Sequence, residues 1–174
     1  MASTFDPELI EKVGAFLAEE AKIKSATVLL APTINIQRSP LGGRAFESFS
    51  EDPHLSGIMA AAYVQGLQSN GVASTIKHFV ANDQEHERTS VDTVMSDRAL
   101  REVYLMPFMI AQRKASPWAY MTSYVRSHSP SSCILKPSPR YNRLNGIHCS
   151  ENPALLDGIL RGEWKFDGLI VSDW

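Results

Sequence analysis

The 174-residue sequence has little cysteine, little net charge and no long apolar run, and each scarcity excludes a class of protein. Two cysteines are too few for a disulfide framework, and we expect Cys133 and Cys149 to be free thiols unless the fold brings their Cα atoms together. A formal net charge of −2 gives no electrostatic footprint for nucleic acid. No apolar stretch reaches the roughly 18 residues of a membrane span, and the first residues lack the basic-then-apolar pattern of a signal peptide. The hydrophobic content of 44% still predicts a globular chain with a core.

Several cofactor and catalytic motifs are absent as well. The sequence contains neither of the glycine-rich phosphate loops, GxGxxG and GxxxxGK[ST], and no Gly-x-Ser-x-Gly nucleophile elbow. His86 lies between Glu85 and Glu87, but adjacent residues on a helix do not face each other, and no pair of histidines has the His-x3-His spacing. We therefore expect no bound metal and no cofactor.

Hydrophobic periodicity alternates between helical and strand patterns along the chain. Helices are expected after Asp6-Pro7, Asp52-Pro53 and Asn152-Pro153, where an N-cap residue precedes a first-turn proline. Ser96 caps one more helix, which Pro107 kinks or ends. The apolar face of the first helix is expected to hold Leu9, Ile10, Val13, Phe16 and Leu17. The expected strands are 26–31, 72–80, 118–124 and 168–172.

This α-β-α-β-α-β-α-β order predicts an α/β fold with a parallel sheet. Two architectures commonly have such an order, the open doubly wound sheet and the (β/α)8 barrel, and the phosphate fingerprints of the first are missing here. A complete barrel needs about 250 residues and eight strands. The chain is therefore expected to form about half of a TIM-type barrel.

A cluster of polar residues follows every expected strand. The clusters are Asn35, Gln37 and Arg38; Lys77 and His78; Thr122, Ser123 and Tyr124; and Ser172, Asp173 and Trp174. The carboxyl ends of parallel strands share one face, which carries the site in such folds. The clusters favour a polar ligand such as a sugar, although strand ends are also polar wherever they meet solvent.

Three short motifs stand out within or near these clusters. In Gly42-Gly43-Arg44, glycines allow a tight backbone and the guanidinium can bind vicinal hydroxyls or a carboxylate, but a plain surface loop is the alternative. Lys77-His78 offers two donors for hydroxyls, or else a satisfied histidine and a solvated lysine. Asp173 follows an apolar strand beside Trp174, so it could be a nucleophile or base near a sugar-stacking ring, or a helix N-cap.

Together these residues resemble glycoside hydrolase family 3, the β-glucosidase family, and its fungal branch most. The matching motifs include PLGGRAFESFSEDP, KHFVANDQEHER, MTSY and GLIVSDW, and the matching runs are 31–57, 71–88, 96–108, 121–124 and 141–174. The resemblance implies part of the N-terminal (β/α)8-type barrel domain of a retaining enzyme. Such an enzyme removes terminal non-reducing β-D-glucosyl residues from glucosides, cellobiose or glucans.

By motif, the resemblance assigns a role to eight residues. Asp173 corresponds to the nucleophile. Arg44, Lys77, His78 and Arg88 correspond to residues that hold the glucose hydroxyls, and Met121, Tyr124 and Trp174 correspond to the walls of that subsite. The implied partner is a β-glucoside or oligosaccharide.

The sequence departs from the family at two ends of the expected barrel. The family's upstream strands, with a sugar-binding Asp, have no counterpart, and its acid/base Glu lies in a later domain, beyond Trp174. The alternative function is therefore a truncated, inactive sugar-binding fragment without its proton donor. A third reading, an unrelated parallel α/β binding domain, would require the motif matches to be accidental.

An insertion interrupts the resemblance at residues 125–141. It is rich in Ser and Pro and has no acidic group, and its removal would give the continuous family-like sequence SYNRLNG. Either Tyr124 or Tyr141 could then be the family's tyrosine. We interpret 125–141 as a retained intron in the gene, with a genuine loop insertion as the alternative. Sequencing the transcript distinguishes them, since a message that keeps these codons under all conditions contradicts the intron.

Overall fold

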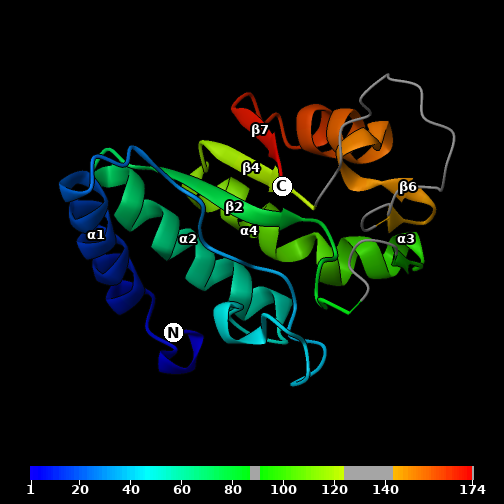
Figure 1. The fold of residues 1–174 in the computed structure, drawn as a ribbon, viewed down its shortest axis with the longest axis horizontal. Coiled ribbons are helices and arrows are strands. Elements are labelled where there is room, and N and C mark those ends of the chain that lie inside the picture. The colour runs from blue at the N-terminus through cyan, green and yellow to red at the C-terminus, as the bar shows by residue number, and fades with distance from the viewer. Residues whose placement is uncertain (87–90, 124–142, 174) are drawn as a thin grey trace, which may run out of the picture.

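The computed structural model describes residues 1–86, 91–123 and 143–173, and its centre is a four-stranded parallel sheet (Figure 1). Its strands are β1 (Val28–Leu29), β2 (Ala73–Phe79), β4 (Ala119–Thr122) and β7 (Leu169–Ser172). They neighbour one another in chain order, β1-β2-β4-β7. A doubly wound sheet would reverse direction at a switch point, whereas a barrel adds each strand beside the last. The expectation of an α/β fold of the partial barrel type is confirmed.

The expected helices all form, and each begins at its expected cap. Helix α1 (Pro7–Ile23) follows Asp6, α2 (Pro53–Ser69) follows Asp52, and α3 (Asp97–Ala99) follows Ser96, and each cap side chain accepts a hydrogen bond from the first turn. Asn152 does the same for the π-type helix η5 (Ala154–Glu163). Three further single turns are η1 (Ala2–Thr4), η2 (Ala45–Glu47) and η4 (Cys149–Glu151). None of the helices in the described ranges is long and apolar enough to cross a membrane.

The helix that starts after Ser96 is built in three parts. After α3 the chain continues as the π-type segment η3 (Leu100–Tyr104), and α4 (Met106–Ala115) then begins with Pro107 in its first turn. Because proline has no N–H and fixes its φ angle, Pro107 ends one helix and starts the next, as its position predicts.

The apolar face predicted for α1 is wrong in part, since Ile10, Val13 and Leu17 are buried or partly buried but Leu9 and Phe16 are exposed. The helix buries Ile10, as expected, together with Gly14, Ala18 and Ala21, but the side chain of Phe16 is 68% exposed and that of Leu9 is 43% exposed. The cause is the close crossing of α1 and α2: a Cβ on Gly14 would lie 2.6 Å from the carbonyl oxygen of Tyr63. Small residues therefore decide which face packs, and the bulkier apolar residues remain outside.

A second, three-stranded sheet was not predicted. It consists of β3 (Asp92–Thr93), β5 (Arg143–Leu144) and β6 (Ile147–His148). The antiparallel pair β5–β6 is joined by Asn145 and Gly146, whose φ angles of 49° and 85° are those of a type I′ turn. The Asn-Gly pair was a usable signal for this hairpin.

The two faces of the main sheet differ in what covers them. Ile76, Tyr120 and Ile170 are paired across the strands and belong to the main hydrophobic core, to which the helices contribute. Helix α1 packs on α2, and α2 packs on α4, so these helices succeed one another beside the sheet (Figure 1). Lys77, Met121 and Val171 are paired on the opposite face, which corresponds to the inside of a barrel.

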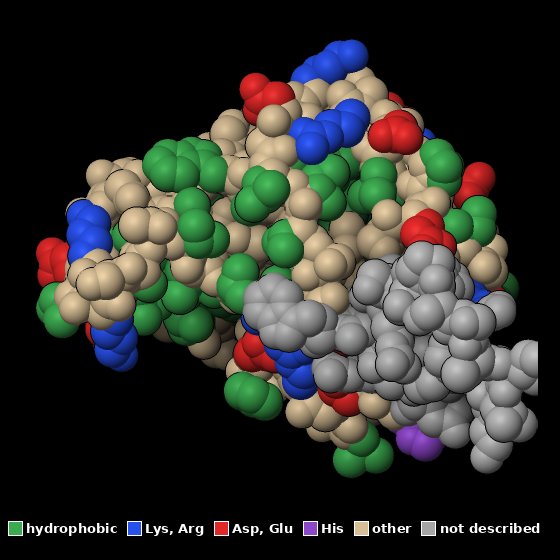
Figure 2. Space-filling model, turned by 45° about the horizontal axis from the view of Figure 1, so that its top comes forward, with side chains coloured by type: hydrophobic (Ala, Val, Ile, Leu, Met, Phe, Trp, Pro, Cys, Tyr) green, Lys and Arg blue, Asp and Glu red, His purple; other side chains and the backbone are tan. Residues whose placement is uncertain are grey.

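The 174-residue chain on its own is expected to aggregate. Strands β1 and β7 each pair on one side only in the described sheet, and Val28 and Leu169 on these edges are 45% and 62% exposed. Figure 2 shows hydrophobic side chains exposed over much of one face. Open edges with apolar residues recruit other chains. We expect size-exclusion chromatography with light scattering to show large species.

Charged substitutions on the open edges test the cause of this aggregation. Val28→Lys and Leu169→Lys should reduce the large species, because charges on edge strands oppose pairing with other chains. Val94→Lys is the matched control, since Val94 is 79% exposed but lies outside the four-stranded sheet. A sharp, cooperative thermal melt of the unsubstituted monomer would contradict the prediction.

Candidate functional site

The ends of β1, β2 and β7 bring three of the predicted site residues to one place. Lys77 and His78 are near the end of β2, and the chain after β1 pairs with this end through Thr33 and Lys77. Asp173 follows β7 directly, and its Oδ2 lies 3.5 Å from Nε2 of His78. The side chain of His78 is only 2% exposed and that of Asp173 is 16% exposed. The polar residues at these strand ends therefore converge, as the sequence predicted.

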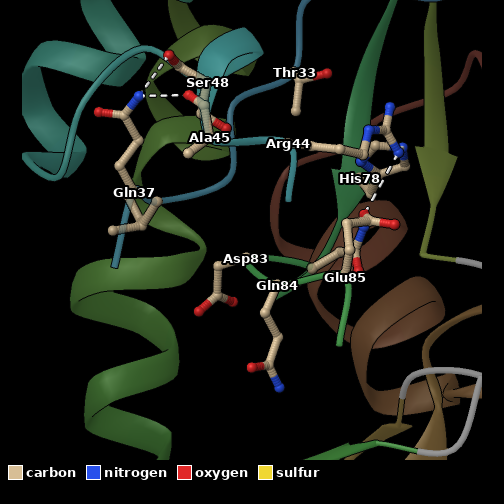
Figure 3. Close-up of a pocket in the computed structure, with 11 residues that line it drawn as sticks. Thr33, Gln37, Arg44, Ala45, Ser48, His78, Asp83, Gln84 and Glu85 are labelled. Carbon is tan, nitrogen blue, oxygen red and sulfur yellow. Dashed lines mark hydrogen bonds and ion pairs between the residues drawn. The ribbon is translucent and has the colours of Figure 1, made fainter. Parts of the chain in front are cut away.

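Arg44 reaches the same place from the loop that follows β1. Its Nη1 lies 3.2 Å from Nε2 of His78, and Figure 3 shows the guanidinium extended toward the imidazole. Gln37 holds the loop, because its amide donates hydrogen bonds to the carbonyl oxygens of Ala45 (2.7 Å) and Ser48 (3.0 Å). The glycine pair has a local reason too: a Cβ on Gly43 would come within 2.9 Å of a Glu85 side-chain atom. The segment is a surface turn with an exposed Gly43, and Arg44 precedes η2 while its side chain reaches inward to His78.

Two carboxylates fix the Arg44 guanidinium, and sequence reasoning assigned a site role to neither. Glu47 forms an ion pair with Nε of Arg44 and accepts a hydrogen bond of 2.8 Å from the Thr33 hydroxyl. Glu85 lies 3.8 Å from Nη1 of Arg44. Burial raises the pKa of Glu47, but hydrogen bonds from Arg44 and Thr33 and the nearby positive charges outweigh it, so the net shift is downward. The spacing of three residues between Arg44 and Glu47 was a sequence signal from which their ion pair could have been predicted.

Lys77 is half-buried beside the same group of charges. Burial lowers the pKa of Lys77, and the positive charge of Arg44 lowers it further, while Glu47 and Asp173 act in the opposite direction. Lys77 is therefore partly withdrawn from solvent among charged neighbours.

Met121 borders Lys77 from the next strand, and three other predicted residues lie outside the described part. Met121 is in β4, where it pairs with both Lys77 and Val171, and its side chain is 2% exposed. It therefore shares the sheet face of Lys77. Arg88, Tyr124 and Trp174 fall in the ranges that the structure does not describe, as do Cys133 and the insertion at 125–141.

Other polar residues at the strand ends have structural partners. Arg38 donates to the Tyr104 hydroxyl at 2.6 Å. The Ser123 hydroxyl donates to the carbonyl oxygen of Val80 at 3.0 Å, and the Thr122 hydroxyl donates to the carbonyl oxygen of Val171 at 3.5 Å. Cys149 is buried with a free thiol, and burial raises its pKa to about 11. These side chains therefore have structural contacts of their own near the strand ends.

The arrangement suits a neutral, hydroxyl-rich ligand near a carboxylate. Asp173 lies beside His78 and near Lys77, and Arg44 contacts the same His78, so Lys77 and Arg44 supply N–H donors and positive charge here. Amide, guanidinium and ammonium donors are the usual partners of hydroxyl and carboxylate oxygens. Within the described ranges, no group of three or more His, Cys, Asp or Glu side chains is placed to hold a metal ion.

Comparison with known families identifies the family of the chain. The sequence model described as "Glycosyl hydrolase family 3 N terminal domain" matches residues 1–174. The chain belongs to glycosyl hydrolase family 3.

Curated family 3 proteins resemble the chain along its whole length. A probable beta-glucosidase J of Neosartorya fischeri is 53% identical over 174 residues, which is 100% of this chain and 18% of that protein. A probable beta-glucosidase K of Emericella nidulans is also 53% identical over the full chain, which covers 19% of it. The chain thus spans about a fifth of the length of the curated relatives it matches.

Solved family 3 structures have the same fold over this region. Beta-glucosidase 3B from Thermotoga neapolitana in complex with glucose has a TM-score of 0.87 and 50% identity, and the match covers 99% of this chain and 22% of that one. A beta-glucosidase from Kluyveromyces marxianus in complex with glucose has a TM-score of 0.88 and 48% identity, with 99% and 19% covered. The described chain therefore has the fold of family 3 enzymes in this region.

Proposed function

We propose that the protein carrying this chain is a β-glucosidase that removes terminal non-reducing β-D-glucosyl residues with retention. The observation that carries the proposal is the carboxylate of Asp173 at the end of β7, 3.5 Å from His78, which Arg44 also contacts. The names of the relatives support it, since they are beta-glucosidases, two of them solved with glucose. Activity of the whole protein is part of the proposal, because the chain covers 18% of the first relative.

In the proposed mechanism, Asp173 attacks the anomeric carbon of the bound glucosyl unit. A bond forms between a carboxylate oxygen and this carbon, the bond to the leaving oxygen breaks, and a general acid protonates that oxygen. Water then attacks the same carbon, gives its proton to the second carboxyl group, and releases β-glucose and the Asp173 carboxylate. Lys77 interacts electrostatically with Asp173, and Arg44 contacts His78 beside it.

A retaining site needs a second carboxyl group about 5–5.5 Å from the first. Family resemblance assigns this acid/base role to a Glu outside the 174 residues. Glu47 and Glu85 already form ion pairs with Arg44, which makes either a poor proton donor. We therefore propose that a later part of the longer protein completes the site.

We assign substrate binding to the polar side chains that contact the glucose hydroxyls and to the side chains that line the subsite around Asp173. Arg44, Lys77 and His78 would bind the glucose hydroxyls, and Met121 would form a wall below the ring. Arg88, Tyr124 and Trp174 keep the roles that the family motif assigns to them. Polar groups placed for each hydroxyl discriminate strongly against analogues that lack one, because the donor is then left unpaired.

The proposal is tested by assay of the purified longer protein with an aryl β-glucoside and with cellobiose. Proton NMR of the first product should show β-glucose before mutarotation, since two displacements at one carbon retain its configuration. α-Glucose as the first product would contradict retention, and absence of turnover with both substrates would contradict the function.

A second candidate function applies to the 174 residues by themselves. The chain includes Arg44, His78 and Asp173 but spans about a fifth of its relatives' length, so alone it could bind sugar without cleaving it. Calorimetric titration with glucose tests this: heat of binding without turnover of an aryl glucoside supports the inactive sugar-binding fragment. The insertion at 125–141 remains proposed as a retained intron within this barrel segment.

Substituting Lys77 by Ala in the longer protein should impair glucosides selectively. If Lys77 binds a hydroxyl group, its loss should lower kcat/KM about 100-fold for the complete glucoside. A deoxy analogue that lacks this hydroxyl should lose less than about threefold. Steady-state kinetics with the glucoside and its 2-, 3-, 4- and 6-deoxy analogues measures the difference. Equal losses for all five substrates would mean that Lys77 is structural.

A further inference from the structure

Asn35 contacts His78 with its side chain at three points, although 43 positions separate the two residues. Its Nδ2 donates to the His78 carbonyl oxygen at 2.9 Å, and its Oδ1 accepts from the His78 main-chain N–H at 2.8 Å. The same Oδ1 lies 3.4 Å from Nδ1 of the imidazole ring. Asn35 is buried, with 4% of its surface exposed. One amide therefore contacts both the backbone and the ring of a residue in the site.

The main chain of His78 sits at an irregular point of the sheet. Pairing between β2 and β4 joins Lys77 to Met121 and then Phe79 to Thr122, so the register passes over His78. Such irregularities redirect a side chain and interrupt the regular ladder, and they are common next to active sites. The Asn35 amide binds both main-chain polar groups of His78, as a neighbouring strand would.

These two main-chain bonds also fix which way the amide faces. The nitrogen must point to the His78 carbonyl and the oxygen to the His78 N–H, because exchanging them would place donor against donor. The oxygen is therefore the atom beside Nδ1, and it favours a proton on Nδ1 of the ring. Nε2 is left to face Nη1 of Arg44 at 3.2 Å and Oδ2 of Asp173 at 3.5 Å.

We propose that Asn35 is a positioning residue, which aims the His78 ring and selects the tautomer with its proton on Nδ1, so that Nε2 faces Arg44 and the site as an acceptor. The inference rests on the proposed function, in which His78 binds a glucose hydroxyl. Asn35 itself is buried behind His78 and acts through it. Hydrogen bonds that tighten in the transition state depend on such alignment, and a misplacement of about 1 Å can cost about 100-fold in rate.

A double-mutant cycle in the longer protein tests the inference. Asn35→Ala should lower kcat/KM for an aryl β-glucoside about 100-fold, mostly through kcat. In a His78→Ala background the same substitution should lower it less than threefold, because the ring that Asn35 aims is gone. Asn35→Asp keeps the acceptor oxygen beside Nδ1 but loses the donor to the His78 carbonyl oxygen, so it should also lower kcat/KM, and in the His78→Ala background by less than threefold.

Asn145 provides a matched control. Its amide makes the same pair of bonds with another main chain, since Oδ1 accepts from Met95 N at 2.9 Å and Nδ2 donates to Met95 O at 3.0 Å. Asn145→Ala should lower the melting temperature but leave kcat/KM within threefold.

Each outcome of the experiment has a distinct meaning. Equal losses from Asn35→Ala in the two backgrounds would overturn the positioning role. If both Asn35 variants fail to fold while Asn145→Ala folds, Asn35 is required for the fold and the inference is also overturned. If the unsubstituted protein shows no turnover, the proposed function fails first.

Discussion

The isolated 174-residue chain is expected to show no measurable β-glucosidase turnover. General acid catalysis typically contributes about 10²–10⁴-fold to a rate, and the proposed acid/base Glu lies outside the chain. The described sheet has four strands and open edges, so the wall of the proposed sugar site is also incomplete. Both losses should bring the rate below about 10⁻⁴ of that of the longer protein. Continuous assay with an aryl β-glucoside, normalised to protein concentration, measures this ratio.

The assay needs a chain that is folded, so solubility and activity should be read together. The Val28→Lys and Leu169→Lys variants, chosen to limit edge pairing, give a soluble sample, and far-UV circular dichroism reports its secondary structure. If a folded sample cleaves the glucoside at a rate near that of the longer protein, a carboxyl group within the chain supplies the proton. Glu47→Gln and Glu85→Gln would then test the two carboxylates that pair with Arg44, and Arg44 contacts His78 of the site.

The parts of the fold that the sequence predicted are those that local chemistry determines. Asp6-Pro7 and Asp52-Pro53 each combine an acceptor for the first turn with a residue whose φ angle already suits a helix. The strand ranges followed from short apolar runs, and Asp173 directly follows β7, at the end of the last of these runs. These signals involve neighbouring residues, so no knowledge of distant contacts was required.

The parts that the sequence did not predict depend on contacts between distant residues. Phe16 is exposed because α1 approaches α2 through Gly14. The geometry of the helix crossing, and not the hydrophobicity of each residue, decides which face of α1 is buried. Glu85 belongs with Arg44 only because the chain after β2 returns beside the loop after β1. Likewise, the Asn35 amide can bind the main chain of His78 because the register of the sheet shifts at that point. Periodicity contains no information on any of these.

Substituting Asp173 by Ala in the longer protein should have the largest effect of any change considered. Removal of a residue that acts in covalent catalysis costs on the order of 10⁴–10⁶-fold in kcat where it has been measured. No glycosyl-enzyme should then form, and the burst of aglycone that precedes steady state should disappear. Asp167→Ala is the matched control, since Asp167 is exposed and precedes the same strand, and it should change kcat less than about twofold.

Azide separates the nucleophile from the acid/base among the carboxyl groups of the site. In the Asp173→Ala variant, azide fits the space beside the anomeric carbon and attacks from the face that the carboxylate occupied. An activated aryl β-glucoside should therefore give α-glucosyl azide, the inverted product, at a rate that rises with azide concentration. The same substitution at an acid/base residue would leave the glycosyl-enzyme intact, and azide would then attack that intermediate to give β-glucosyl azide. Because Asp173 lies at the end of β7 beside His78, we expect the α product; the β product would assign proton transfer to Asp173 and nucleophilic attack to another carboxyl group.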